Sequence, residues 1–203
     1  MTKKFGKAFK KVKFIIANSK YTKSLGIDLG LDQNKIHVIN PGTDYPIAVL
    51  QSDKANAKSI FGNAFPKIIT VARLDKRKSH QNILMTIKNL IPTYPDIKHV
   101  CVGDGEEKSN LLSLAKQLDI EKQVTFLPRL DQGMKNALLN EADLFLMPSV
   151  MHKKSVEGFG ISFIEAASYG VASIGGKVGG QADAIDDGRS GFFLYRYWFD
   201  EGS

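Results

Sequence analysis

Hydrophobic and polar positions alternate regularly along residues 67–194. Short apolar runs bounded by glycine or polar residues predict buried strands, and the longer stretches between them carry apolar residues at helical spacing. We expect strands within KIITVARL, IKHVCVG, QVTFLP, DLFLMPS, VASIGG and GFFLY. We expect helices within SHQNILMTIKNLIPTY, EEKSNLLSLAKQLDI, DQGMKNALLNEA and ISFIEAASYG. This alternation predicts an α/β domain with a parallel sheet and helices on both faces.

The domain organisation predicted from these patterns has four parts. Residues 1–48 hold two further strands, FIIANS and KIHVIN, on either side of a helical piece, KYTKSLGIDLG. Residues 49–66 contain proline and glycine and little periodicity, which is typical of a linker. Residues 67–195 form the main domain, and the tail 196–203 has no assignment. Both ends have the character of pieces cut from something larger.

The composition is ordinary for a soluble globular protein, with 43% hydrophobic and 24% charged residues. The single cysteine, Cys101, lies in the apolar run HVCVG, which predicts a buried, reduced thiol. A lone cysteine excludes an internal disulfide and a cysteine-based metal site, and it fits a cytoplasmic protein. No apolar run reaches the roughly 20 residues of a membrane-spanning helix.

The net charge of +7 is concentrated at one end of the chain. Residues 1–14 contain six lysines and no acid, with an apolar stripe formed by Phe5, Ala8, Phe9 and Val12. Residues 3–13 could therefore contact an anionic membrane surface peripherally, at the inner face of the membrane. We favour the alternative, an ordinary amphipathic helix packed on its own domain. No basic and aromatic platform elsewhere indicates nucleic-acid binding.

Ligands of parallel α/β sheets bind at the carboxyl ends of the strands. That rule selects the loops that follow Val71, Val102, Leu127 and Met147. We therefore expect the functional side chains in these four loops.

The first of these loops, ARLDKRKSHQN, carries two candidate cations, Arg73 and Lys78. Arginine supplies a planar fork and lysine a mobile point charge, a pair suited to gripping a diphosphate. The other two basic residues of the loop, Lys76 and Arg77, are interpreted as a solvated turn.

The second loop, VGDGEEK, offers Gly103 and Gly105. A dinucleotide fingerprint would need a third glycine at residue 108, which is Lys108, so a nicotinamide-dependent enzyme is disfavoured. The two glycines still permit a close approach of the backbone to a ligand.

The fourth loop contains SVEGFGISFIEAASYG, with Glu157 and Glu165 separated by seven residues. Glu165 could simply cap a helix in a Ser-x-x-Glu box with Ser162, and Glu157 could simply answer nearby lysines. Gly158 and Gly160, however, leave amides bare at a helix start, where an anion is favoured. A ligand with a central diphosphate and hydroxyl groups on both sides fits this pattern, because its phosphates accept from the amides and its hydroxyls donate to the carboxylates. That ligand is a nucleotide sugar.

The stretch EGFGISFIEAASYG resembles the E-x7-E signature of the retaining GT4 glycosyltransferases, which have the GT-B fold. Further segments resemble that family in the same order: FIIANSKYTKSLG, KIHVINPGTD, ARLDKRKS, VGDGEE, ADLFLMPS and GGQADAIDDGRSGFF. The resemblance extends from about residue 14 to 194. It implies that residues 67–195 are the Rossmann-like donor-binding domain, the C-terminal half of a GT-B fold, and that residues 1–48 end a truncated acceptor-side domain.

The resemblance also implies roles for individual residues. Arg73 and Lys78 would hold the diphosphate, and Glu157 would accept from hydroxyls of the donor sugar; these three are the catalytic candidates. Glu165 would accept from the ribose. The remaining donor-binding candidates are the amides of the glycine-rich turn and the loops that border the base: Gly158, Phe159, Gly160, Gly103, Gly105, Pro128 and Arg129.

The implied reaction is transfer of a sugar from a GDP- or UDP-linked donor to a saccharide or lipid-linked acceptor, with retention and without a metal or cofactor. His37, His80, His99 and His152 are expected to be isolated, in agreement with a metal-free site. An epimerase or phosphorylase would need acids or a cofactor lysine that the sequence lacks. The alternative is a nucleotide-sugar-binding module or inactive remnant, and the isolated chain is expected to be inactive.

Three positions depart from the family pattern. Ser79 and Pro128 stand where glycine is usual, and Asp183 stands where glutamate is usual. Because Ser79 has a side chain where glycine has none, it is in question whether a ligand can approach the backbone of this loop closely.

Overall fold

The structure is a computed structural model that describes residues 12–44 and 47–194. The amphipathic stretch 3–13 lies almost entirely, and the tail 196–203 entirely, outside these residues. The main domain is a six-stranded sheet with the order β5-β4-β3-β6-β7-β8, and every pairing is parallel. Its strands are β3 (Lys67–Val71), β4 (Lys98–Val102), β5 (Val124–Leu127), β6 (Leu144–Met147), β7 (Ala172–Gly176) and β8 (Gly191–Leu194). This is the strand order of the Rossmann fold, and the parallel sheet that the sequence pattern predicts is confirmed.

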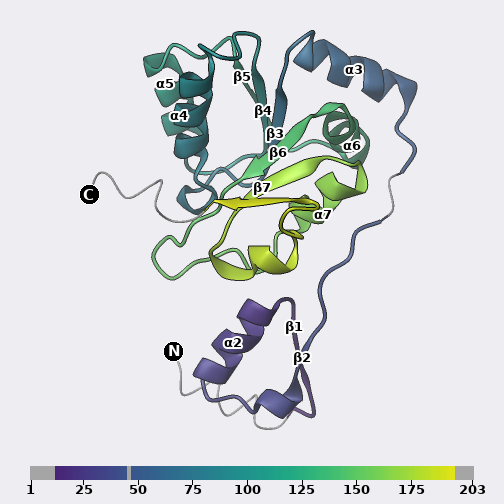
Figure 1. Ribbon diagram of the computed structural model, residues 1–203, viewed down its shortest axis with the longest axis vertical. Coiled ribbons are helices and arrows are strands. Elements are labelled where there is room, and N and C mark those ends of the chain that lie inside the picture. The colour runs from purple at the N-terminus through teal and green to yellow at the C-terminus, as the bar shows by residue number, and fades with distance from the viewer. Residues whose placement is uncertain (1–11, 45–46, 195–203) are drawn as a thin grey trace.

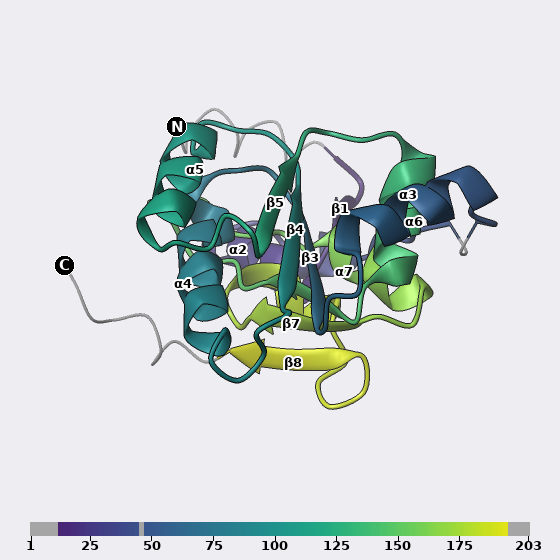
Figure 2. The same ribbon diagram turned by 90° about the horizontal axis from the view of Figure 1, so that it is seen from above.

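Helices cover both faces of the sheet (Figures 1 and 2). One face carries α4 (His80–Leu90) and α5 (Lys108–Gln117), and the other carries α3 (Gln51–Phe61), α6 (Gln132–Glu141) and α7 (Ile161–Ser168). Three short 3-10 helices, η1 (Gln33–Lys35), η2 (Lys76–Lys78) and η3 (Gly179–Asp183), complete the described elements.

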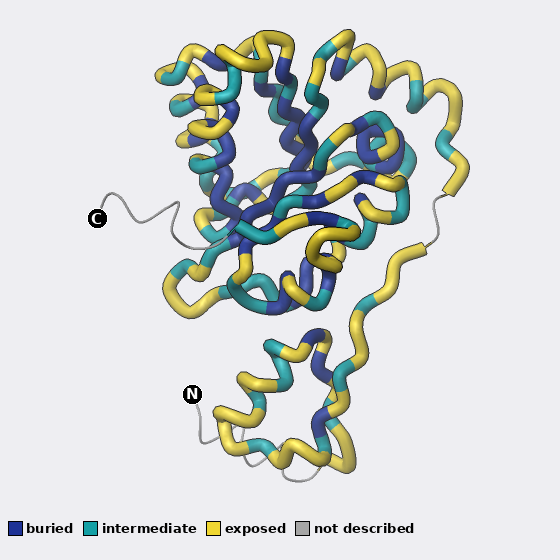
Figure 3. Tube along the Cα trace, in the orientation of Figure 1, coloured by how far each residue is buried: buried dark blue, intermediate teal, exposed yellow. Residues whose placement is uncertain are grey.

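Buried side chains alternate between the two faces because successive residues of a strand point in opposite directions. Ile68 packs with α4 and α5, whereas its neighbour Ile69 packs on the α6 side. On the α6 side Phe145 meets Phe163 of α7 edge to face, with ring centroids 5.5 Å apart. Figure 3 shows the resulting concentration of buried residues along the central strands. The near-continuous apolar runs of the sequence are thus explained by burial on both faces.

The segment expected to be an unstructured linker, 49–66, contains helix α3. Ala57 and Phe61 are buried in the core on the α6 side, and α3 lies along α6. The helix has a mostly polar sequence and few apolar positions, so its periodicity is weak. Packing against α6 stabilises it, as is usual for short helices in proteins.

Residues 12–44 form a small separate unit (Figure 1). Strand β1 (Ile15–Ala17) pairs in parallel with β2 (Ile36–Val38), and α2 (Lys20–Asp28) connects them through η1. These elements agree with the predicted strand-helix-strand pattern.

The small unit contacts the main domain at the start of α2. The Lys20 backbone N–H donates to the Asp183 carboxylate at 2.7 Å. Asn18 lies over Gly158, where an added Cβ would be 3.1 Å from the Asn18 Nδ2. At Gly180 an added Cβ would meet the Ser19 Oγ at 2.6 Å and would overlap the Gly158 carbonyl. The small unit therefore packs directly against the backbone of Gly158 and Gly180, where any larger residue would place a side chain in the contact.

In the part of the chain that the structure describes, no helix is long and apolar enough to cross a membrane.

Candidate functional site

The strand order reverses between β3 and β6, the two central neighbours of the sheet. The chain leaves β3 toward α4 on one face and leaves β6 toward α7 on the other. The two loops therefore diverge and open a crevice at the carboxyl ends of the strands, which is where doubly wound sheets bind ligands. Both loops carry charged residues singled out in the sequence.

The loop after β3 is shaped by Asp75. Its Oδ1 accepts from the Lys78 backbone N–H at 3.1 Å and caps η2. Ser79 follows in the left-handed region with φ of 59°, a conformation that glycine adopts without strain and that accounts for the glycine usual at this position. The tight turn directs Lys78 inward, where only 7% of the residue is exposed.

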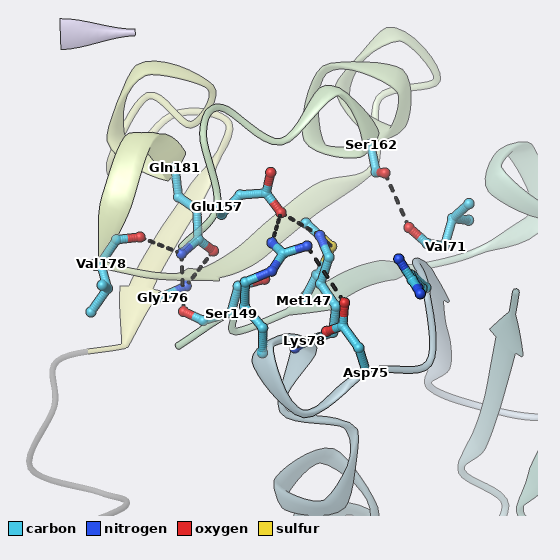
Figure 4. A network of polar contacts seen from close by, with 12 residues as sticks. Val71, Asp75, Lys78, Met147, Ser149, Glu157, Ser162, Gly176, Val178 and Gln181 are labelled. Carbon is cyan, nitrogen blue, oxygen red and sulfur yellow. Dashed lines mark hydrogen bonds and ion pairs between the residues drawn. The ribbon is translucent and has the colours of Figure 1, made fainter. Parts of the chain in front are cut away.

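Glu157 joins the two loops through a cluster of charges (Figure 4). Its Oε2 accepts from the Lys78 Nζ and from the Arg77 Nη1, the latter at 2.8 Å. The Arg77 Nη2 lies 3.6 Å from the Asp75 Oδ2, and the Lys78 Nζ lies 3.2 Å from the Met147 Sδ. These four charged side chains are each less than one fifth exposed. The cluster is consequently a semi-buried network that solvent screens only weakly.

The environment shifts the pKa of both members of the Lys78–Glu157 pair downward. Burial is the main cause for Lys78 and, with the charge of Arg77, outweighs the opposing effect of Glu157. For Glu157 burial alone would raise the pKa, but Lys78 and Arg77 together lower it below its usual range. Glu157 is therefore ionised, and Lys78 and Arg77 neutralise its charge.

The backbone around Glu157 is fixed from the β7 side. The Gly180 N–H donates to the Glu157 carbonyl at 2.8 Å. The fully buried Gln181 binds three strand-end backbone groups: its Nε2 donates to the carbonyls of Ser149 and Val178, and its Oε1 accepts from the Gly176 N–H. Figure 4 shows these contacts beside Glu157. The segment GGQAD thus supports the loop that carries the carboxylate.

Glu165 does not cap a helix. Helix α7 begins after Gly160, which has φ of 97° and makes no side-chain cap. Ser162 instead donates from its Oγ to the Val71 carbonyl at 3.0 Å, tying α7 to the end of β3. Glu165 pairs with Lys135 of α6 at 2.6 Å, with both side chains less than one fifth exposed. The simpler interpretation of Glu157 also fails, because its partners are Arg77 and Lys78 rather than the lysines of its own loop.

A cavity of about 410 Å³ opens at the carboxyl ends of the strands. It joins the ends of β3, β4 and β5 to helix α6, and its lining consists of Val71, Ala72, Arg73, Val102, Gly103, Asp104, Arg129, Leu130, Gln132 and Lys135. Among the predicted residues, Arg73, Gly103 and Arg129 border it directly. Glu165 adjoins it through Lys135, its partner in the lining. The Arg73 side chain is 70% exposed, and its Nη2 lies 3.6 Å from the Glu106 Oε2.

Gly103 and Gly105 have a structural reason that differs from the one predicted. An added Cβ at Gly103 would overlap the Ala72 carbonyl, and one at Gly105 would overlap the Leu74 carbonyl. The Leu74 N–H also donates to the Asp104 carbonyl at 3.0 Å. These glycines let the β4 loop pack against the β3 loop, so that both border one cavity.

The other predicted donor-binding residues lie around these features. Pro128 is exposed beside Arg129, and the Phe159 side chain is buried in the core. Gly158 faces Asn18 of the small unit.

Sequence reasoning missed two cations. Arg77, interpreted as part of a solvated turn, is 19% exposed and bonded to Glu157, whereas Lys76 is exposed as expected. Lys135 is an ordinary lysine in an amphipathic helix, and no local signal marks it. The available signal is indirect: a buried carboxylate requires a counterion, so burial of Glu157 and Glu165 implies one basic partner for each.

Two of the histidines expected to be isolated belong to a buried polar group under the β3 loop. The His80 Nε2 lies 3.0 Å from the Arg73 carbonyl, and its Nδ1 lies 3.6 Å from the Cys101 Sγ. The His99 Nε2 lies 3.0 Å from the Thr70 Oγ1. Burial raises the pKa of the Cys101 thiol to about 12, as fits an unreactive core cysteine. Within residues 12–44 and 47–194, no group of three or more His, Cys, Asp or Glu side chains could hold a metal ion.

Several known proteins are similar to this chain in sequence or in fold. A family model described as glycosyl transferases group 1 matches residues 51–200. The chain is 35% identical over 128 residues to a GDP-mannose-dependent phosphatidylinositol monomannoside mannosyltransferase of Corynebacterium glutamicum, covering 62% of this chain and 33% of that protein. It is 30% identical over 191 residues to D-inositol 3-phosphate glycosyltransferase 2 of Catenulispora acidiphila, covering 87% and 43%.

Solved structures share the fold. Anabaena HepE, in complex with UDP and glucose, superposes with a TM-score of 0.78 at 23% identity, over 93% of this chain and 51% of that one. A glycosyltransferase from Rickettsia africae gives 0.80 at 19% identity, over 95% and 53%. The chain thus spans between a third and about half of the length of these proteins.

Proposed function

The chain belongs to the group 1 glycosyl transferases, and on this premise we propose that it is the donor-binding half of a retaining hexosyltransferase. The donor is a nucleoside-diphosphate sugar, GDP- or UDP-linked, and the acceptor is a saccharide or a lipid-linked saccharide. The relatives whose names state a donor or ligand are GDP-mannose-dependent or bound to UDP, and both bases are retained in the proposal. The reduced core cysteine suits action in the cytoplasm.

The observation that carries the proposal is the convergence of both signature glutamates with basic side chains at the switch point of the sheet. Lys78 of the β3 loop pairs with Glu157 of the β6 loop, and Arg73, Arg129 and Lys135 line the cavity of about 410 Å³. A nucleotide sugar laid across this region would put its diphosphate near the cations and its ribose near Glu165. Its sugar would lie near Glu157, and its base would lie in the cavity.

In this arrangement Lys78 and Arg73 neutralise the charge that grows on the diphosphate as the glycosidic bond breaks. Charges preorganised in a partly desolvated site stabilise a transition state more than the same charges in water do. Glu157 accepts hydrogen bonds from donor-sugar hydroxyls, and Glu165 accepts from the ribose. No metal is required in this scheme, since side chains carry the positive charge.

Titration calorimetry with UDP, GDP, UDP-glucose, UDP-N-acetylglucosamine and GDP-mannose tests the proposal. One base is expected to bind, and Lys78→Ala should weaken it about tenfold to a hundredfold, the effect of one charge-assisted hydrogen bond. Lys76→Ala is the matched control, because Lys76 is exposed in the same turn. Absence of binding by the folded chain, or equal losses in the two variants, would refute the proposal.

A second candidate function is a nucleotide-sugar-binding module without turnover. It is favoured by one observation: the two buried ion pairs, Lys78 with Glu157 and Lys135 with Glu165, are both assigned to the donor, and none of the described residues is assigned to an acceptor. Transfer needs an acceptor held in line with the donor, and we propose that the isolated chain lacks that activity. Release of nucleoside diphosphate from a bound donor, measured with and without oligosaccharide and lipid-linked acceptors, separates the two functions.

A further inference from the structure

One carboxylate oxygen serves two cations in this structure. The Glu157 Oε2 accepts from both Arg77 and Lys78. Under the proposed function, on which this inference rests, Lys78 donates to the diphosphate of the donor. The charge of Lys78 is then shared between Glu157 and the diphosphate, and a semi-buried carboxylate that loses part of its counter-charge is strongly disfavoured.

Arg77 is built to stay where it is. Its Nη1 contacts Glu157 at 2.8 Å while its Nη2 faces Asp75 at 3.6 Å. Its backbone carbonyl accepts from the Val150 N–H at 2.9 Å, which ties it to the loop after β6. The planar guanidinium can contact two carboxylates at once.

Lys78 is held differently. Its ammonium sits at the end of a flexible stem, between Glu157 and the thioether of Met147. A thioether is a weak acceptor, so a diphosphate oxygen would be the better partner. Of the two cations, Lys78 is the one that can change partners.

We propose that Arg77 is a positioning residue that holds Glu157 ionised and in place, so that Lys78 can turn from Glu157 to the diphosphate of the donor. The charges support this division of roles. Asp75 and Glu157 balance Arg77 and Lys78 in the free protein. When the diphosphate takes Lys78, Arg77 remains as the counterion of Glu157.

A double-mutant cycle on Arg77 and Glu157 tests the assignment, with affinity for UDP and GDP measured by calorimetry. These ligands have the ribose and the diphosphate but lack the sugar that is transferred, so the proposed role of Glu157 toward that sugar does not enter. Arg77→Ala leaves Lys78 as the sole partner of Glu157 and should weaken binding about tenfold or more. Glu157→Gln removes the competing carboxylate, and in that background the same Arg77→Ala change should have no effect.

Arg77→Lys provides a second measurement that needs no loss of charge. A lysine keeps the positive charge but cannot span Asp75 and Glu157, so its affinity should also fall. Lys76→Ala again removes one exposed positive charge from the same turn and should leave affinity close to that of the unmodified chain. Circular dichroism shows whether each variant is folded. If Arg77→Ala does not fold, the result with Arg77→Lys decides the outcome.

The outcomes separate the two proposals. If the unmodified chain binds neither UDP nor GDP, the proposed donor site itself is wrong. If it binds and Arg77→Lys binds equally well, Arg77 contributes only its charge and the positioning role is refuted. A loss in Arg77→Ala that persists in the Glu157→Gln background would mean that Arg77 acts on the ligand directly, which also overturns the inference.

Discussion

Acidification should destabilise this protein chiefly through one buried imidazole, that of His99. The Thr70 hydroxyl donates its only proton to the Leu146 carbonyl at 2.5 Å. It must therefore accept from the His99 Nε2, which assigns the proton of the ring to Nε2. The His99 Nδ1 is buried with no hydrogen-bond partner among the described residues. Protonation would place an unpaired N–H and a charge in the core.

The magnitude follows from the pKa. Burial, with a smaller contribution from His80, lowers the pKa of His99 from 6.5 to about 3. Between these values the unfolded chain binds the proton and the folded chain does not, so the free energy of unfolding falls as pH falls through this window. Between pH 7 and pH 4 the expected loss from this group alone is about 3 kcal/mol.

Urea denaturation at a series of pH values measures this effect. His99→Gln keeps an amide donor for Thr70 but cannot titrate, so its free energy of unfolding should depend less on pH, by about 3 kcal/mol between pH 7 and pH 4. His37→Gln is the matched control, because His37 is exposed on β2. If His99→Gln and the unmodified chain lost equal stability over this range, the assigned tautomer and the buried state of the ring would both be refuted.

Two further predictions concern packing and binding. Gly103→Ala should destabilise the fold by about 2–4 kcal/mol, because the added Cβ overlaps the Ala72 carbonyl and the φ of 149° suits only glycine. The control is Gly42→Ala, where the added Cβ meets no atom within 4 Å, so the urea midpoint should change little. Equal midpoints for the two variants would contradict the packing argument. Lys135→Ala should weaken nucleotide-sugar affinity about tenfold, because it leaves the second signature carboxylate without its cation. Calorimetry against Lys116→Ala, an exposed lysine of α5, checks this, and equal affinities would count against a role for the pair.

The strand and helix order of the main domain could be predicted from the sequence because its central strands β3, β4 and β6 are buried on both faces. Such strands appear as continuous apolar runs, and the polar loops between them are unambiguous. Helix α3 was missed for the opposite reason: most of its residues face solvent, and only Ala57 and Phe61 are buried. Its stability depends on α6, which lies about 70 residues further along the chain.

The candidate site divides in the same way. The positions of Lys78 and Glu157 followed from a rule about strand ends, which is a property of the sheet. The tight η2 turn, capped by Asp75, directs Arg77 toward Glu157 and leaves Lys76 exposed, and the sequence alone does not show this. The partnership of Glu165 with Lys135 depends on the crossing of α6 and α7, a tertiary detail that neither helix encodes alone.

The glycines beneath the small unit have a practical consequence for anyone recombining this protein with its relatives. Asn18 and Ser19 press on Gly158 and Gly180, and the backbone of Gly158 directly follows Glu157. A chimera that keeps this main domain but imports another strand-helix unit would bring a new side chain against the backbone of Gly158 and Gly180, where a side chain has no room. A joint within residues 41–44 or 47–50, which hold no helix or strand, separates Asn18 and Ser19 from these glycines, so the imported unit should keep asparagine and serine at these two positions.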